Sequence, residues 1–396
     1  MKKLFSSLPA KLLVGIIIGI IVGLIVPESV MAVLVPIKNI MGQLINFVVP
    51  LIVIGFIAPS ITKLGSSASR MLGVALVLAY ASSVLAALLS TAAGYVLIPI
   101  MNTAKEAAAL RELPADVFAL EIPQIMSVMS ALAFSVLIGL AAVWTKAKTV
   151  ITLLDEFQKI VLEIVSRVVI PILPFFIACT FCCLAYEGTI TEQLPIFLKA
   201  VVVVLIGHFV WMAVLYGVAG VYAGENPREV FRHYGPAYIT AVGTMSSAAT
   251  LSVALQCAHK SKVLRKDMVD FGVPLFANIH LCGSVLTETF FCMIVSLILT
   301  GSLPGVGTML LFCALLAIFA IGAPGVPGGT VMASLGIVTS ILGFGPEGTA
   351  LLLAIFAIQD SFGTACNVTG DGALTLMLTG YARKHNIKEE KLEVNL

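Results

Sequence analysis

The chain has 396 residues, of which 59% are hydrophobic and 11% are charged, and its formal net charge is +2. Its mean hydropathy is +1.08, whereas about a quarter of the residues in a soluble globular domain are charged. This composition excludes a water-soluble enzyme and a disordered scaffold, and the small net charge excludes nucleic acid as a partner. The sequence therefore indicates a polytopic membrane protein.

Long apolar blocks predict an all-α protein that crosses the lipid bilayer several times, because a membrane-spanning helix needs about 20 apolar residues. The first blocks are 9–26, 31–61, 70–100, 124–145, 152–186 and 196–222. The later blocks are 235–257, 268–300, 306–343 and 347–380. No small-residue cleavage site follows the first block, so we expect it to be retained as the first span.

Blocks 235–257 and 306–343 differ from the others because Ser-Ser or Gly/Pro clusters interrupt them. If neither block crosses the membrane, most of the 23 Lys and Arg residues collect on one side. By the positive-inside rule that side is cytoplasmic, and both termini lie there. The sequence thus predicts eight transmembrane helices plus two re-entrant helical hairpins in inverted repeats, an arrangement typical of secondary transporters.

The tips of the two hairpins carry small and polar residues. The first tip runs from Gly243 to Ser252 and the second from Gly322 to Thr330. Backbone that turns at membrane depth has to be buried in protein or line a watery cavity, where free amides favour an anion and free carbonyls favour a cation. The alternative interpretation is that Gly and Pro only kink two spanning helices.

The last span carries a polar stripe. Asp360, Thr364, Asn367 and Asp371 are spaced four, three and four residues apart, so they lie along one face of a helix. A carboxylate inside a span is costly, and such residues are candidates for function by default. Two acids and an amide suit an ammonium group and a cation, and the alternative is a buried polar network without a ligand.

Together these motifs resemble the dicarboxylate/amino acid:cation symporters, also called the glutamate transporter family. The resemblance covers essentially the whole chain and rests on Asn367-Val-Thr-Gly-Asp371, on Ser246-Ser247 with Thr250-Leu251, and on Gly325-Val-Pro-Gly328. It implies a homotrimer in which a transport domain moves like an elevator against a static trimerisation scaffold. The scaffold would be 1–68 and 101–195, the transport domain 69–100 and 196–382, and the cytoplasmic tail 383–396.

Carried over by position, the resemblance implies roles at the hairpin tips and in the last two spans. Asp360 would bind a substrate ammonium group, Asn367 would bind its α-carboxylate, and Val326 would belong to a gate. The substrate site would comprise Ser246, Ser247, Ser284, Val326, Asp360, Gly363, Thr364 and Asn367. A sodium ion would be held, partly through backbone carbonyls, by Asn278, His280, Leu281, Asn367 and Asp371.

Two departures from the family favour a neutral L-amino acid as the substrate. Members that carry acidic amino acids have an Arg where this chain has Gly363, and some prokaryotic members have one where it has Met245. A second substrate carboxylate would be buried without a partner, at a cost of about 3–5 kcal/mol. We expect a substrate like serine, threonine or alanine, or a larger one, since Gln359-Asp-Ser resembles the serine/threonine symporters. An acidic amino acid or a dicarboxylate is the alternative.

A third departure concerns the coupling ion. The family's Asn-Met-Asp-Gly-Thr in span 7 is replaced by His280-Leu-Cys-Gly-Ser284. His and Cys are poor ligands for a hard cation, although Ser82 and Ser83 could still supply hydroxyl oxygens. We expect Na+ coupling, with H+ coupling through His280 or uncoupled exchange as alternatives.

Other classes of function have less support. A channel would need a ring-forming selectivity motif, and an enzyme would need a nucleophile–base pair or a metal-ligand cluster, none of which the sequence contains. Glu288 is a further acid inside a span, and no role follows from the sequence. The short loops favour a multi-pass protein of a prokaryotic inner (plasma) membrane.

Overall fold

The computed structural model describes residues 8–66, 70–101, 113–114, 117–188, 190–323 and 327–387. Within these ranges all regular structure is helical, as the apolar blocks predict. The first helices are α2 (Leu8–Ile25), α3 (Glu28–Ser66), α4 (Arg70–Met101), α5 (Val128–Trp144), α6 (Lys148–Ile164), the π-helical η1 (Val165–Val169), α7 (Ile170–Glu187) and α8 (Ile190–Ala223). The later ones are α9 (Arg228–Phe231), α10 (Gly235–Thr244), α11 (Ser247–His259), α12 (Lys266–Ile279), α13 (Cys282–Thr300), α14 (Val306–Gly322), α15 (Gly329–Ile341) and α16 (Pro346–Lys384).

Six helical segments of the described chain are long and apolar enough to cross a membrane. They are Glu28–Pro59, Arg70–Met101, Lys148–Glu187, Pro195–Ala223, Lys266–Thr300 and Pro346–Lys384. Val14–Ile25 and Ala133–Trp144 are shorter apolar helices that coincide with the expected first and fourth spans. The chain is a multi-pass membrane protein, and the exact count of eight spans stays a prediction.

Two pairs of short helices occupy the places of the expected hairpins. Between α10 and α11 only Met245 and Ser246 are non-helical, and Met245 has a left-handed backbone with φ of +51°. Between α14 and α15 the described residues Pro327 and Gly328 form a turn, and Gly328 has φ of +72° and caps α15. The members of each pair pack against each other, so both pairs are helical hairpins.

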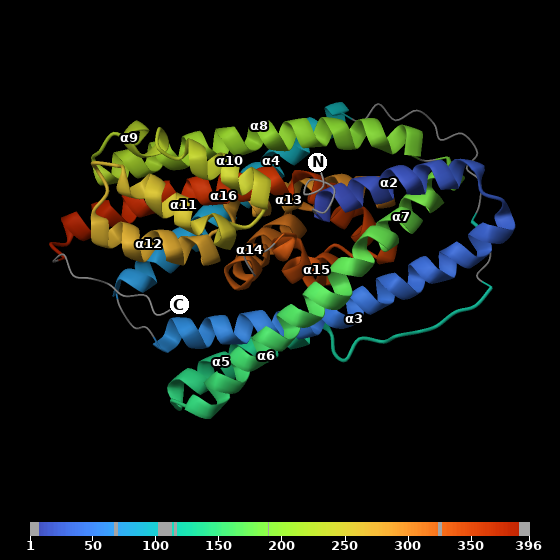
Figure 1. The fold of residues 1–396 in the computed structure, drawn as a ribbon, viewed down its shortest axis with the longest axis horizontal. Coiled ribbons are helices and arrows are strands. Elements are labelled where there is room, and N and C mark those ends of the chain that lie inside the picture. The colour runs from blue at the N-terminus through green and yellow to red at the C-terminus, as the bar shows by residue number, and fades with distance from the viewer. Residues whose placement is uncertain are drawn as a thin grey trace.

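Helices α13 and α16 lie at the centre of the protein, and α12 leads into α13 from one end (Figure 1). In the most apolar windows of α12–α13 and α16, 89% and 78% of the residues are buried, against 33% in α8 and 39% in α4. The helix α13 packs against α16, α4 and α8, whereas α2, α3, α5, α6 and α7 pack mainly on one another. The buried polar side chains of α12–α13 and α16 are therefore enclosed by helices whose outer faces are apolar.

Helix α2 packs closely along α7, because three glycines on one face of α2 leave no side chain between the two backbones. A Cβ on Gly19 would stand 2.3 Å from the carbonyl oxygen of Ala178. The same substitution at Gly15 or Gly23 would meet a carbonyl oxygen of α7 at 2.7 or 2.3 Å. Small residues spaced four apart are a common basis for close helix packing in membranes.

Candidate functional site

The break between α12 and α13 brings His280 into contact with α16. His280 Nδ1 lies 2.9 Å from Asp371 Oδ1, and His280 Nε2 lies 2.8 Å from Ser82 Oγ of α4. Because an ionised carboxylate can only accept hydrogen bonds, Nδ1 is the donor to Asp371. The exposed fractions of the three residues are 0%, 1% and 4%. Three helices are thus joined through one buried imidazole.

One turn earlier on α16, Asn367 binds the start of α13. Its Oδ1 accepts hydrogen bonds from the backbone N–H groups of Gly283 (2.7 Å) and Ser284 (3.2 Å). Its Nδ2 donates to Ser284 Oγ at 2.9 Å. The first N–H groups of a helix have no partner within that helix, so the Asn367 carboxamide caps α13.

Asp360 of α16 binds the tip of the second hairpin. Its Oδ2 accepts a hydrogen bond from the backbone N–H of Gly328 at 2.7 Å, at the N-terminus of α15. This pairing is favourable because helix N-termini attract negative charge. Asp360 is 6% exposed. Val326, the predicted gate residue, lies outside the described residues.

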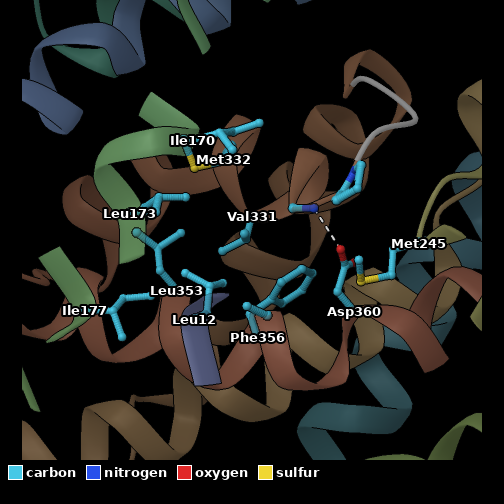
Figure 2. Close-up of a pocket in the computed structure, with 13 residues that line it drawn as sticks. Leu12, Ile170, Leu173, Ile177, Met245, Val331, Met332, Leu353, Phe356 and Asp360 are labelled. Carbon is cyan, nitrogen blue, oxygen red and sulfur yellow. Dashed lines mark hydrogen bonds between the residues drawn. The ribbon is translucent and has the colours of Figure 1, made fainter. Parts of the chain in front are cut away.

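A small apolar pocket opens beside Asp360 (Figure 2). Asp360 and Met245 lie at one end of it, and Ile170, Leu173 and Ile177 of α7 lie at the other. The remaining lining residues are Leu12, Pro327, Gly328, Val331, Met332, Leu353, Phe356 and Ala357. The pocket volume is about 20 Å³, which is room for about one water molecule.

The predicted residues of the first hairpin lie at or next to this pocket. Met245 lines the pocket, and Ser246 Oγ accepts a hydrogen bond from the backbone N–H of Ala249 at 3.2 Å, which caps α11. Ser247 is the first residue of α11 and is buried. The two predicted serines therefore follow directly on the pocket-lining residue.

Gly363 and Thr364 lie on the buried part of α16 that faces α13. A Cβ on Gly363 would stand 3.4 Å from the backbone nitrogen, the Cα and the Oγ of Ser284. Thr364 is also buried. The structure thus brings Ser284, Gly363 and Asn367 together, with Asp360 one turn earlier on the same helix.

The side chains of the predicted sodium ligands do not form a set of converging oxygens in the described structure. Asn278 is exposed, and its Nδ2 donates to the carbonyl of Pro274 in its own helix at 2.8 Å. The carboxamide of Asn367 is hydrogen-bonded to the start of α13, and Asp371 Oδ1 is hydrogen-bonded to His280. Leu281 is buried and brings no side-chain oxygen. Hard cations require several oxygen ligands, so these side chains do not by themselves fit a sodium ion at Asp371 Oδ1, and the contribution of backbone carbonyls stays a prediction.

Two ionisable residues of the central region were not assigned a role from the sequence. His208 of α8 is buried, and its Nε2 lies 3.1 Å from the carbonyl oxygen of Gly283 and 2.9 Å from Thr287 Oγ1. Glu288 of α13 is also buried, and one carboxyl oxygen binds the hydroxyl of Ser334 in α15. An ionisable residue within an apolar block is the signal that marked Glu288 in the sequence, and the same signal could have singled out His208.

Comparison with known proteins places this geometry in a family. Residues 8–380 match the model of the sodium:dicarboxylate symporter family. Excitatory amino acid transporter 2 of Mus musculus is 30% identical over 260 residues, which cover 64% of this chain and 44% of the relative. Excitatory amino acid transporter 1 of Homo sapiens is 26% identical over 208 residues, 52% of this chain and 37% of the relative.

The matched segments thus span less than half the length of these curated relatives. The family match, in contrast, extends over nearly the whole chain and includes both hairpins and the polar stripe of α16. Its members are transporters, in agreement with the expectation drawn from the motifs. The chain belongs to the sodium:dicarboxylate symporter family.

Proposed function

We propose that the protein is a secondary active transporter of a neutral L-amino acid. The observation that carries this proposal is the position of Asp360 at one end of an apolar pocket (Figure 2). Asp360 is the only charged side chain among the described residues that line it. A carboxylate suits the substrate ammonium group, and the apolar wall suits an uncharged side chain.

Two positions argue against an acidic substrate, one in the pocket lining and one on α16 three residues after Asp360. Gly363 and Met245 stand where a guanidinium would otherwise pair with a second carboxylate, and neither can donate a hydrogen bond from its side chain. The relatives are named for excitatory amino acids, which supports an amino acid as the substrate, whereas the family name includes dicarboxylates, which supports the alternative. An acidic amino acid or a dicarboxylate is the alternative substrate.

The pocket lies between elements assigned to different domains in the proposed elevator mechanism. Leu12 and Ile177 belong to the proposed scaffold, and Val331, Phe356 and Asp360 belong to the proposed transport domain. A volume of about 20 Å³ is too small for an amino acid, so the hairpin held by Asp360 would open to admit one. We propose a homotrimer in a plasma membrane with both termini in the cytoplasm.

Na+ coupling is the family's general property, and H+ coupling or uncoupled exchange is the alternative for this chain. The contact between His280 and Asp371 favours the alternatives, because a histidine occupies the carboxylate oxygen at which sodium coupling was expected.

The proposal is tested by binding and uptake of the twenty amino acids with protein in proteoliposomes. We expect saturable binding of neutral amino acids and its loss in Asp360→Asn, because the ammonium group loses its counter-charge. Asp270→Asn is the matched control, since that carboxylate is 61% exposed and lies outside the pocket. If Asp360→Asn binds as tightly as the wild type, the site is placed wrongly.

The alternative substrate has its own test. Gly363→Arg should shift preference towards acidic amino acids, because it introduces a guanidinium next to Ser284. Wild-type uptake of aspartate or a dicarboxylate in preference to every neutral amino acid would instead establish the alternative.

A further inference from the structure

The imidazole of His280 lies where three buried helices meet. It is 0% exposed, and both ring nitrogens have a partner on another helix, Ser82 on α4 and Asp371 on α16. No regular helix presents this side chain, because His280 lies in the break between α12 and α13 with φ of −115° and ψ of 99°. The break therefore places this side chain between the three helices.

A buried carboxylate needs a partner that supplies positive charge or hydrogen-bond donors. Asp371 Oδ1 receives the Nδ1–H group of His280 at 2.9 Å. A cation that bound the same oxygen would have to stand close to that N–H dipole, whose positive end points at the oxygen. The donor and a metal ion are therefore alternatives at Asp371 Oδ1.

The ring has little room to move away and make space for a cation. Ser82 Oγ holds Nε2 at 2.8 Å on the opposite side from Asp371. Gly370 lies against the ring, since a Cβ at that position would stand 2.9 Å from His280 Cε1 and 3.4 Å from Cys282 Sγ. The glycine thus provides the space that the ring fills, one residue before Asp371.

The other carboxylate oxygen offers a poor site by itself. Asp371 Oδ2 has no hydrogen-bond partner among the described residues. The nearby Tyr216 hydroxyl is already used, because it donates to the carbonyl oxygen of Thr369 at 2.8 Å. One free oxygen is far fewer than the several that a hard cation requires.

We infer that His280 is a built-in substitute for a coupling cation at Asp371, so that the protein assembles its central site without sodium bound to this carboxylate. The inference rests on the proposed function only where it concerns substrate binding. The rest of the inference concerns the contact of His280 with Ser82 of α4 and Asp371 of α16, which forms without a sodium ion at this carboxylate.

The structural part is tested by thermal unfolding of the purified full chain without any substrate, in sodium chloride and in choline chloride at equal ionic strength. The melting temperature of the wild type should be the same in both salts. His280→Asn should be less stable in choline chloride and should gain a stabilisation specific to sodium, because Asp371 then lacks a donor and has space beside it. His259→Asn is the matched control at the C-terminal end of α11, where the side chain is 39% exposed.

Two results would overturn the inference. The first is a sodium-specific stabilisation of the wild type that disappears in Asp371→Asn, because sodium would then use this carboxylate despite His280. The second is a folded His280→Asn variant that remains indifferent to sodium. If that variant cannot be purified, Ser82→Ala takes its place, because it removes the hydroxyl that holds the His280 ring. The comparison of wild-type melting temperatures in the two salts tests the inference without any variant.

Substrate binding separates the failure of this inference from the failure of the proposed function. A neutral amino acid should bind the wild type with the same Kd in both salts. A sodium-dependent Kd that becomes independent in Asp371→Asn contradicts the inference and leaves the substrate proposal standing. Absence of any amino acid binding contradicts the proposed function, and the unfolding experiment still decides on His280.

Discussion

At the scale of single residues, the polar stripe of α16 consists of three separate joints. Asp360 binds the tip of the second hairpin, Asn367 binds the start of α13, and Asp371 binds His280. Each joint satisfies backbone or side-chain groups that are buried away from water. The stripe therefore stabilises the centre of the protein as well as forming the proposed site.

The Asn367 joint gives a testable prediction about stability. Asn367→Ala removes three hydrogen bonds and leaves the N–H groups of Gly283 and Ser284 unpartnered. We expect the free energy of unfolding to fall by about 2–4 kcal/mol, measured by denaturant titration in mixed micelles. Asn278→Ala is the matched control, because that side chain is exposed and bonds only within its own helix, so its effect should be within about 0.5 kcal/mol. Equal losses in both variants would contradict the capping role.

At the scale of helices, close packing depends on where glycine removes a side chain. Gly19 of α2 lies against the backbone of α7, whereas Gly73 of α4 is exposed and a Cβ there would meet no atom within 4 Å. The same substitution at the two positions should therefore have opposite effects.

Gly19→Ala should destabilise the protein by about 1–3 kcal/mol, because its Cβ would stand 2.3 Å from a carbonyl oxygen and the helices would have to separate. Gly73→Ala should stabilise it by about 0.5–1 kcal/mol through helix propensity alone. Melting temperatures of the two variants in the same detergent provide the measurement. A Gly19→Ala variant that melts at or above the wild-type temperature would show that α2 is not held by this contact.

The sequence predicted the helices better than their interruptions. Block 70–100 corresponds to α4, and the two broken blocks correspond to hairpins, because hydropathy and Gly, Pro and Ser mark such features directly. Block 152–186 was taken as continuous, yet it contains the π-helical segment Val165–Val169. In block 268–300 hydropathy alone gives one span, whereas the family resemblance implies an unwound part at His280–Ser284, and the helix breaks at His280. The π-helical segment carries no Gly or Pro that would mark it in the sequence, so tertiary packing decides the backbone there.

The candidate site was predicted in part for a similar reason. Spacing along α16 placed Asp360, Asn367 and Asp371 on one face, because helical periodicity is a local property. The family resemblance put His280, Asp371 and Ser82 near one cation site, but their direct contacts were not predictable, since His280 is 91 residues from Asp371 and 198 from Ser82 in the chain. Which side chain contacts which carboxylate depends on how the helices pack, and this packing cannot be derived from the local pattern of a single sequence.

At the scale of the whole molecule, the pocket beside Asp360 joins the two proposed domains. Ile177 of α7 and Leu353 of α16 both line it and both are buried. If α16 moves relative to α7 during transport, a covalent link between the two helices must stop the transport cycle. The link should leave the substrate site in place.

A reducible cross-link between cysteines at Ile177 and Leu353, in a background without the eight native free cysteines, should therefore lower uptake by at least about tenfold. Reduction of the link should restore uptake, and substrate binding should persist throughout. The control link joins Leu12 and Ile177, which lie on α2 and α7 of the proposed scaffold, and should leave uptake intact. Full uptake in the fully linked Ile177–Leu353 protein would contradict the proposed domain movement.

The close packing of α2 and α3 on α7 has a consequence for biosynthesis. Cys182 of α7 contacts Met31 of α3, which is 151 residues earlier in the chain. At a synthesis rate of roughly 5–20 residues per second, the N-terminal helices wait about 8 to 30 seconds for α7 to emerge from the ribosome. During this interval the glycine face of α2 lacks the helix against which it packs in the folded protein, and the arrival of α7 completes the N-terminal half.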